Sequence, residues 1–300
     1  MFGWEFPPHI AGGLGTASYG LTKGLAKHGV KVMFVMPKAG GDEDQSVVKI
    51  INASDVEMMS EYSNLDEYWQ NVNFMEIGSN LVSYLDPETF ERTVKETIKT
   101  GEHSEHIVFR NKFQFSGKYG TNLMEEVARY AMVAGTIAAQ QDFDIIHAHD
   151  WLTYSAGIVA KKVSGKPLVI HVHATDFDRS RGKVNPTVYS MEKNGMDYAD
   201  CIMCVSELTR RTVINEYHQD PRKVFAMHNA VYPLSQELQD IPRPDHSKEK
   251  VVTFLGRITM QKGPEYFVEA AALVLQRTRN IRFVMAGSGD MLNAMINLAA

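Results

Sequence analysis

The chain has 300 residues, of which 44% are hydrophobic and 22% are charged, and its formal net charge is −5. This length suits about two globular domains of roughly 100–200 residues each, and the acidic balance does not indicate a nucleic-acid partner. No apolar run approaches the ~18 residues of a membrane helix, and the first residues lack the pattern of a signal peptide. We therefore expect a cytoplasmic protein without a transmembrane segment.

A glycine-rich stretch, "AGGLGTA" at residues 11–17, lies close to the start of the chain and follows only "MFGWEFPPHI". Helical spacing predicts a helix over Thr16–His28, and the apolar run of residues 30–37 predicts a buried strand. A glycine loop that opens a helix usually follows a strand. Either the first strand is very short, or the chain has lost its beginning.

Residues 39–118 are polar and irregular, with short helical pieces expected at 64–74 and 86–101. Beyond them, apolar strands alternate with amphipathic helices. Helices are predicted at 120–141, 152–165, 185–199 and 206–218, and strands at 144–149, 167–173, 201–206 and 223–231. This alternation implies an α/β protein with a parallel sheet and helices on both of its faces.

A proline-rich polar segment, residues 232–249, is the predicted linker between an N-terminal domain at 1–231 and a C-terminal domain at 250–300. The second domain is predicted to hold strands at 251–257 and 281–290, a helix at 264–278 and another helix that begins at Met291. Two strands do not make a stable sheet domain, so we expect the second domain to be incomplete in this chain.

The two cysteines, Cys201 and Cys204, have the C-x-x-C spacing that occurs in redox and metal sites. They lie in a predicted strand, where positions i and i+3 point to opposite faces. The chain has no second cysteine pair to complete a zinc site. We interpret both as core thiols.

Paired histidines end two of the predicted strands, His147 with His149 and His171 with His173. Open α/β sheets bind ligands at the carboxyl ends of their strands. Both members of an H-x-H pair face the same side of a strand, which allows a metal pair. Taken alone, each pair is more typical of a structural role, in which an imidazole ring satisfies buried backbone groups.

Two glycine turns and two basic residues have the composition of a phosphate site. Gly12 and Gly13 precede a helix whose amides favour a phosphate, although G-G-x-G also fits a tight turn. Arg257 and Lys262, in "LGRITMQKG", lie between a strand and a helix start, where two cations can clamp a diphosphate or form a solvated basic loop. Gly287, in "MAGSGD", belongs to a similar strand-to-helix turn.

In their order these pieces resemble the GT-B retaining glycosyltransferases of family four, the group that neighbours the glycogen and starch synthases. The stretches that carry the resemblance are "FPPHIAGGLG", "IIHAHDW", "VHATDFDRS", "VSELTRR", "HNAV", "LGRITMQKG" and "AGSGD". They cover nearly the whole chain. The resemblance implies two Rossmann-like doubly wound domains that face each other across a cleft, with the second domain incomplete here. It also implies transfer of a hexose from a nucleotide-diphosphate sugar to a glycan or a small hydroxyl acceptor, in carbohydrate biosynthesis.

The resemblance assigns roles to residues of the first domain. Gly12 and Gly13 would place backbone amides near the donor diphosphate and the acceptor. His173 matches the family histidine that hydrogen-bonds the donor sugar. Asp150 matches an acidic residue with an acceptor-side or structural role, and Asn229 lies on a loop near the hinge.

In the second domain, Arg257 and Lys262 match the pair that neutralises the leaving diphosphate, and Gly287 would lie near the nucleotide. In the front-face mechanism proposed for such enzymes, the donor phosphate itself takes the acceptor proton. The resemblance therefore implies neither a metal nor a cofactor, and the nucleotide sugar is a substrate.

The sequence departs from the family in three ways. Relatives carry a few residues before Met1, so the chain looks clipped at its start. The family's E-x7-E motif, whose glutamates contact the donor sugar and ribose, would lie beyond the end of this sequence. Glycogen and starch synthases usually have a lysine where this chain has Ile10, so the donor and the acceptor are not determined.

Three other functions agree with parts of the sequence. A metal-dependent hydrolase would use the four histidines and would have a barrel fold. The linker and the second glycine turn argue against a barrel. A GT-B nucleotide-sugar epimerase would share the fold. A non-catalytic binding module would agree with a donor domain of which half is absent. The sequence does not indicate an oligomeric state.

Overall fold

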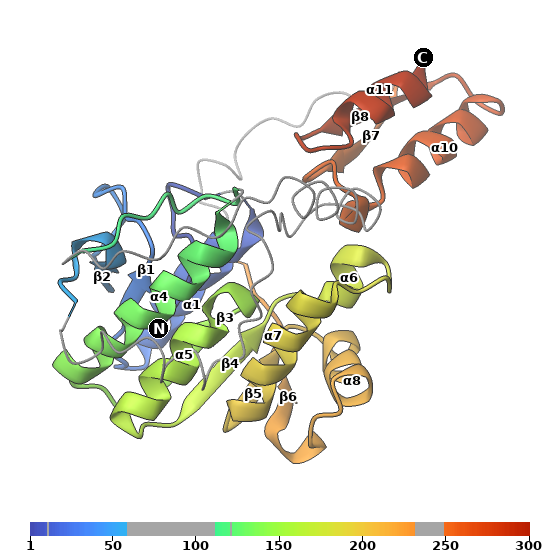
Figure 1. The fold of residues 1–300 in the computed structure, drawn as a ribbon. Coiled ribbons are helices and arrows are strands. Elements are labelled where there is room, and N and C mark those ends of the chain that lie inside the picture. The colour runs from blue at the N-terminus through green and yellow to red at the C-terminus, as the bar shows by residue number, and fades with distance from the viewer. Residues whose placement is uncertain (11, 59–111, 121, 232–248) are drawn as a thin grey trace, which may run out of the picture. The chain divides into compact units, whose positions relative to one another are not determined.

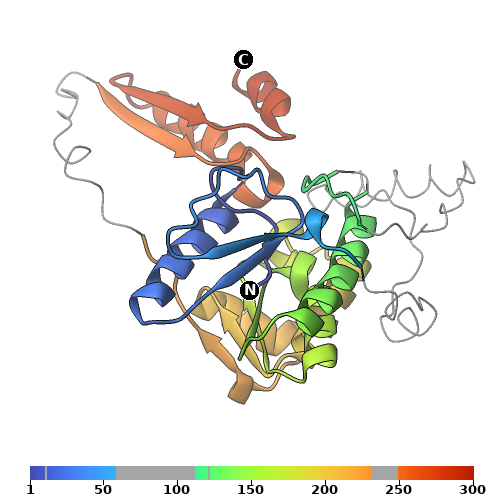
Figure 2. The ribbon, with the colours of Figure 1, turned by 90° about the vertical axis from the view of Figure 1, so that its left-hand side faces the viewer.

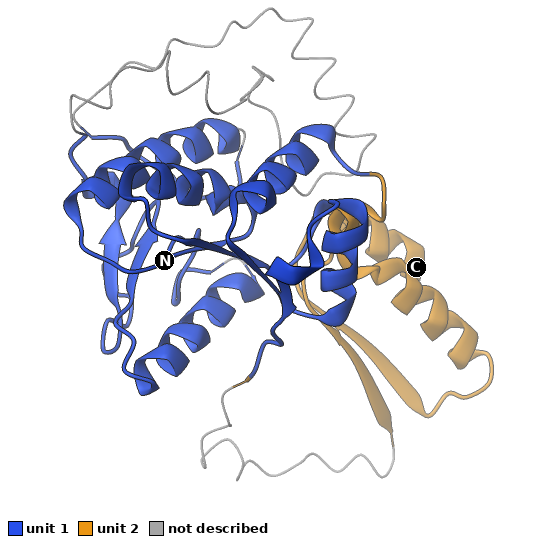
Figure 3. Ribbon diagram, turned by 90° about the horizontal axis from the view of Figure 1, so that it is seen from below, with its two compact units in different colours: residues 1–176, 184–230 blue, residues 177–183, 231–300 orange. Residues whose placement is uncertain are grey.

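The computed structural model describes residues 1–10, 12–58, 112–120, 122–231 and 249–300 (Figure 1). The chain forms two compact units (Figure 3): unit 1 comprises Met1–Asp176 with Val184–Ala230, and unit 2 comprises Phe177–Lys183 with Val231–Ala300. The helical pieces expected at 64–74 and 86–101 and nearly all of the predicted linker lie outside the described residues. Among the described residues, no helix is both long enough and apolar enough to cross a bilayer.

Unit 1 is built on parallel strands. They are β1 (Met33–Met36), β2 (Lys49–Asn52), β3 (Ile146–His149), β4 (Leu168–Val172), β5 (Cys201–Cys204) and β6 (Val224–Ala226). β1 pairs with β2, and β3 to β6 follow one another in order. Phe2 forms parallel bridges to Val35 of β1 and to Ala148 of β3. The first residues therefore join the two groups of strands through isolated bridges, and the described residues before α1 hold no named strand.

Strand β2 lies in a segment for which the sequence predicts no regular element. The run "VVKII" at residues 47–51 is rich in β-branched residues, which favour strands, and it is the local feature that indicates β2. Val48 belongs to a buried core cluster with Phe34 and Phe6, and Ile50 packs against that cluster. Pairing with β1 and packing on this core stabilise β2 as a strand. Neither contact can be predicted from the four residues of the strand alone.

Helices cover both faces of the sheet. They are α1 (Gly13–Lys27), α4 (Leu123–Gln140), α5 (Trp151–Ser164), α7 (Pro186–Tyr198) and α8 (Glu207–Glu216), whereas α6 (Asp176–Ser180) lies at the boundary between the two units of the chain. Figure 2 shows α1 and α4 on opposite sides of β1. The long helices agree with the predicted ones, except that α1 begins at Gly13 instead of Thr16, and α6 was not predicted. The Ser206 hydroxyl caps α8 by accepting the Thr209 N–H at 3.0 Å.

Helix α5 is the central helix of unit 1. It packs against α4, α7, β3 and β4, and all of its residues from Trp151 to Ala160 are buried. The stretch "WLTYSAGIVA" is mostly apolar on all sides of the helix. A helix of this kind is stable when other elements pack around it, as they do here. Because α5 starts directly after Asp150, its packing holds the carboxyl end of β3 in a fixed place.

Unit 2 contains a parallel strand pair and two helices in its described part. The elements are β7 (Lys250–Leu255), the short 3₁₀ helix η4 (Met260–Lys262), α10 (Pro264–Leu275), β8 (Ile281–Ala286) and α11 (Leu292–Ala299). β7 pairs with β8 along its whole length, from Lys250 opposite Ile281 to Leu255 opposite Ala286. Both predicted strands and both predicted helices are present. The segment Phe177–Lys183 belongs to this unit, which the sequence did not indicate.

Both cysteines lie on β5 as free thiols, with Cys204 buried and Cys201 partly buried. Burial raises the pKa of the Cys204 thiol to about 12. Because the thiolate is the reactive form, Cys204 should hold on the order of a thousandfold less of it at pH 8 than a free cysteine. We expect iodoacetamide at pH 8 to modify Cys204 slowly in the folded protein and quickly in urea, as mass spectrometry can measure. Equal rates in the two conditions would contradict the core-thiol interpretation.

Candidate active site

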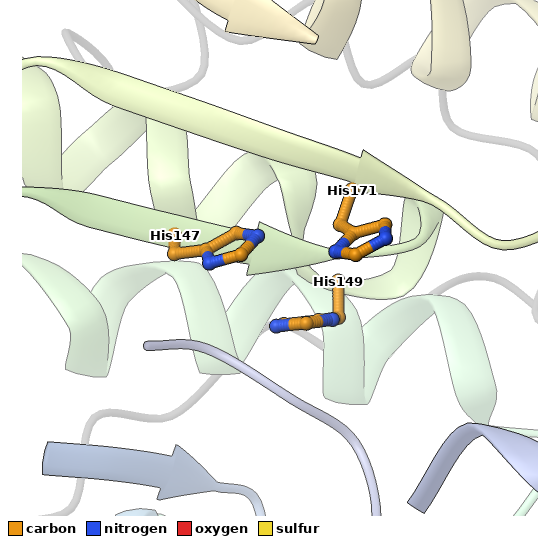
Figure 4. A group of neighbouring side chains, drawn as sticks. All are labelled: His147, His149 and His171. Atoms are coloured by element: carbon orange, nitrogen blue, oxygen red, sulfur yellow. The ribbon is translucent and has the colours of Figure 1, made fainter. Parts of the chain in front are cut away.

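The two H-x-H pairs form one cluster of imidazole rings at the carboxyl ends of β3 and β4. Figure 4 shows three of the four rings. His149 and His171 are register partners on the two strands, and their ring centroids lie 5.2 Å apart. The centroids are 4.4 Å apart within each pair. The expectation that both members of a pair face one side is confirmed, and strand pairing brings the two pairs together.

Burial favours the neutral form of three of these rings, those of His147, His149 and His171. His149 and His171 are buried, and desolvation lowers the pKa of His147 and His149 well below its usual value. The same desolvation lowers the pKa of His171 to about 3. His149 Nδ1 lies 3.0 Å from His173 Nε2, so one of these two nitrogens donates a hydrogen bond to the other. The three neutral rings do not supply a positive charge for a phosphate near pH 7.

Asp150 fixes the chain beside His173. It directly follows β3 and is the N-cap residue of α5, with φ 58° and ψ 169°. This backbone region costs a residue other than glycine about 1–3 kcal/mol. Its Oδ1 accepts the His173 backbone N–H at 2.8 Å, and its own N–H donates to the His171 carbonyl at 3.0 Å. Asp150 therefore positions the backbone from which the His173 ring projects.

We expect Asp150→Ala to lower the free energy of unfolding by about 1–3 kcal/mol, because the His173 N–H loses its acceptor. Asp150→Asn keeps an oxygen in the same place and is the matched control. Urea unfolding followed by circular dichroism measures both variants. If alanine and asparagine cost the same, the contact between Oδ1 and the His173 N–H does not hold this part of the chain.

The glycines at the start of α1 have two different surroundings. Gly12 is the N-cap residue and Gly13 is the first helical residue, and a Cβ added to Gly13 would meet no described atom within 4 Å. Gly15 is enclosed, since a Cβ there would lie 2.4 Å from Ile10 Cγ2, and its N–H donates to Glu5 Oε1 at 3.1 Å. The Glu5 carboxylate therefore accepts a hydrogen bond from one amide of the first turn of α1. The sequence did not predict this contact.

In unit 2 the turns that follow β7 and β8 are joined. The Ile258 N–H donates to the Ser288 carbonyl at 2.8 Å. Gly287 has φ 155°, and a Cβ at this position would lie 1.8 Å from the Gly256 carbonyl oxygen, so only glycine permits the approach. Arg257 lies between Gly256 and Ile258. The structure therefore brings Arg257 and the Gly287 turn together at the carboxyl ends of two parallel strands.

Lys262 lies in η4, directly before α10, and is exposed. A residue that the sequence did not single out, Arg181, holds this turn. Its Nε and Nη2 donate to the Met260 carbonyl at 3.1 and 2.7 Å, and it forms an ion pair with Glu265 in the first turn of α10. The basic pair in "DRSR" was a weak signal, because nothing in its spacing connects it to residue 260.

The predicted site residues thus fall into groups within each unit. Asp150 is joined to His173 in unit 1, and Arg257 is joined to the Gly287 turn in unit 2. Asn229 lies beyond the end of β6 and is exposed, and its role stays a prediction.

Comparisons with known proteins identify the chain's relatives. The starch synthase catalytic domain model matches residues 1–227, and the glycosyl transferases group 1 model matches residues 236–300. An uncharacterized glycosyltransferase of Methanocaldococcus jannaschii is 25% identical over 311 residues, which cover 99% of this chain and 65% of that protein. The UDP-Gal:alpha-D-GlcNAc-diphosphoundecaprenol alpha-1,3-galactosyltransferase of Escherichia coli is 29% identical over 167 residues, which cover 51% of this chain and 43% of that enzyme.

The fold is also that of solved glycosyltransferase structures. Sucrose-phosphate synthase of Thermosynechococcus elongatus superposes with a TM-score of 0.60 at 14% identity, over 96% of this chain and 62% of that one. The parallel α/β units and this structural likeness show a GT-B glycosyltransferase fold. The chain belongs to the starch synthase catalytic domain family, as the sequence resemblance implied. It spans about two thirds or less of the length of these relatives.

Proposed function

We propose that the full-length protein transfers a hexose from a nucleotide-diphosphate sugar to a glycan or other hydroxyl acceptor, with retention of the anomeric configuration. The observation that carries this proposal is the joined pair of turns in unit 2, which sets Arg257 beside the Gly287 turn at the strand ends. Family membership supports it, and so does the E. coli relative, a galactosyltransferase whose name gives UDP-Gal as its donor.

The role of Arg257 and Lys262 follows from where charge develops. Breaking the bond between the sugar and the diphosphate leaves negative charge on the diphosphate and positive charge on the anomeric carbon. Fixed cations at the growing negative charge stabilise the transition state more than the ground state, and this difference accelerates the reaction. Arg181 supports this role indirectly, because it holds the turn that carries Lys262.

In unit 1, His173 would hydrogen-bond the donor sugar, with its backbone held by Asp150. The start of α1 at Gly12 and Gly13 would favour an anionic or hydroxyl group, because the amides of a helix N-terminus attract negative charge. The bond from the anomeric carbon to the diphosphate breaks as the bond to the acceptor oxygen forms. The acceptor proton passes to the leaving phosphate oxygen, so this scheme needs neither a protein nucleophile nor a metal ion.

The test uses the protein with both ends as long as those of its relatives. It is incubated separately with ADP-glucose, UDP-glucose and GDP-mannose, with EDTA present, and nucleoside diphosphate release is measured with and without glycogen. Release that depends on glycogen supports the proposal and identifies the donor. Release from none of the three donors, together with zinc-restored activity on another substrate class, would replace it with the hydrolase alternative.

A further inference from the structure

The histidine cluster contains buried nitrogens that the structure leaves without partners. Within the described residues, four buried nitrogens of these rings have no hydrogen-bond partner: His147 Nε2, His149 Nε2, His171 Nδ1 and His171 Nε2. His149 is 0% exposed and His171 is 4% exposed. Buried polar atoms almost always have a partner in folded proteins, and leaving one unpaired costs free energy. Four such atoms in one place are the nitrogens to which a bound ion or water molecules would be joined.

The arrangement of the rings suits a metal ion. His147, His149 and His171 each offer one ring nitrogen, and these three nitrogens lie within 4.8 Å of one another. Nitrogens of His147 and His171 point toward each other from neighbouring strands, and His149 lies beside both rings (Figure 4). We propose that these three histidines bind one divalent transition-metal ion of the zinc class, which plays no part in bond breaking by the transferase.

The geometry and the chemistry of the ligands agree with zinc. Zinc bonds to imidazole nitrogen at about 2.0–2.1 Å, which places tetrahedral ligands about 3.3 Å apart, so a bound ion would draw the three nitrogens closer together than the 4.8 Å within which they now lie. Neutral imidazole is the form that binds zinc, copper, iron and nickel. Three histidines also leave a fourth coordination position for a water molecule.

His173 would serve as an outer partner of the bound ion. A histidine that binds a metal usually donates its other N–H to a nearby acceptor, and this contact fixes the orientation of the ring. His149 Nδ1 lies 3.0 Å from His173 Nε2, so His149 can donate there while its Nε2 faces the ion. The ion would then tie β3 to β4 and fix the ring of His149, whose other nitrogen faces His173.

Metal content tests the inference directly. The 300-residue chain is expressed with a tag that lacks histidine, and zinc per chain is measured by inductively coupled plasma mass spectrometry. We expect about one zinc per chain, and a higher Tm when zinc is added to chelator-treated protein, because an ion that binds only the folded state stabilises it. Cobalt(II) should produce visible d–d absorption typical of tetrahedral nitrogen ligands.

Variants assign the metal to the cluster. His171→Gln and His147→Gln should each weaken zinc binding at least tenfold and abolish the cobalt spectrum. His28→Gln, at the exposed end of α1, is the matched control and should bind like the wild type. Circular dichroism reports whether each variant folds, and if His171→Gln does not fold, the less buried His147→Gln decides.

Two results would overturn the inference: wild-type protein that holds no metal and shows no rise in Tm with zinc, or cluster variants that bind zinc as tightly as the wild type. The first would mean that water molecules satisfy these nitrogens. Neither readout depends on sugar transfer, so failure of this inference and failure of the proposed function remain distinguishable.

Discussion

Replacing Arg257 with alanine should lower kcat for hexose transfer by about a hundredfold or more in the full-length protein, or about 3 kcal/mol of transition-state stabilisation. The guanidinium is proposed to face the diphosphate, whose negative charge grows as the sugar bond breaks. Its position is set by backbone contacts between the turns after β7 and β8. Initial rates at saturating donor separate this loss from weaker donor binding.

Arg282→Ala is the matched control for this variant. Arg282 lies on β8 in the same unit, is exposed, and pairs with Glu249 at 2.8 Å. Exposed ion pairs contribute little to stability, so this variant should fold and transfer at nearly the wild-type rate. Wild-type turnover in Arg257→Ala would exclude this arginine from the diphosphate contact.

His173→Ala should also reduce transfer by about a hundredfold, because a hydrogen bond to the reacting sugar would be lost in the transition state. The substitution removes the ring and leaves the backbone N–H that Asp150 accepts. The fold around residue 173 should therefore persist, which a thermal melt can check. The assay is again kcat with saturating donor and acceptor.

His28→Ala provides the comparison for His173→Ala, since His28 is exposed at the end of α1. It should leave kcat unchanged. A folded His173→Ala variant with wild-type kcat would exclude His173 from contact with the reacting sugar, and Asp150 would then lose its proposed role in positioning a catalytic side chain.

Local sequence patterns predicted much of this molecule. The alternation of apolar strands and helices predicted β3 to β6 and the helices between them, including a helix that starts at Ser206, the residue that caps α8. The common facing of each H-x-H pair followed from the period of a strand. These features depend on contacts within a few residues, and a single sequence contains that information.

Contacts between distant residues could not be predicted in this way. The two histidine pairs lie close together because the register of β3 and β4 places His149 opposite His171. The hydrogen bond from Arg181 to the Met260 carbonyl joins residues 79 positions apart. The hydrogen bond from the Gly15 N–H to Glu5 depends on how the first residues of the chain fold back. Each arises from tertiary packing, for which the sequence offered no local signal.

The configuration of the transferred sugar tests the central claim most directly. Once a donor is identified, proton NMR of the product formed from an α-linked nucleotide sugar reveals the new anomeric linkage. Retention predicts an α-linked product, formed in the presence of EDTA. A β-linked product would contradict the front-face scheme and the proposal that the protein transfers the sugar with retention.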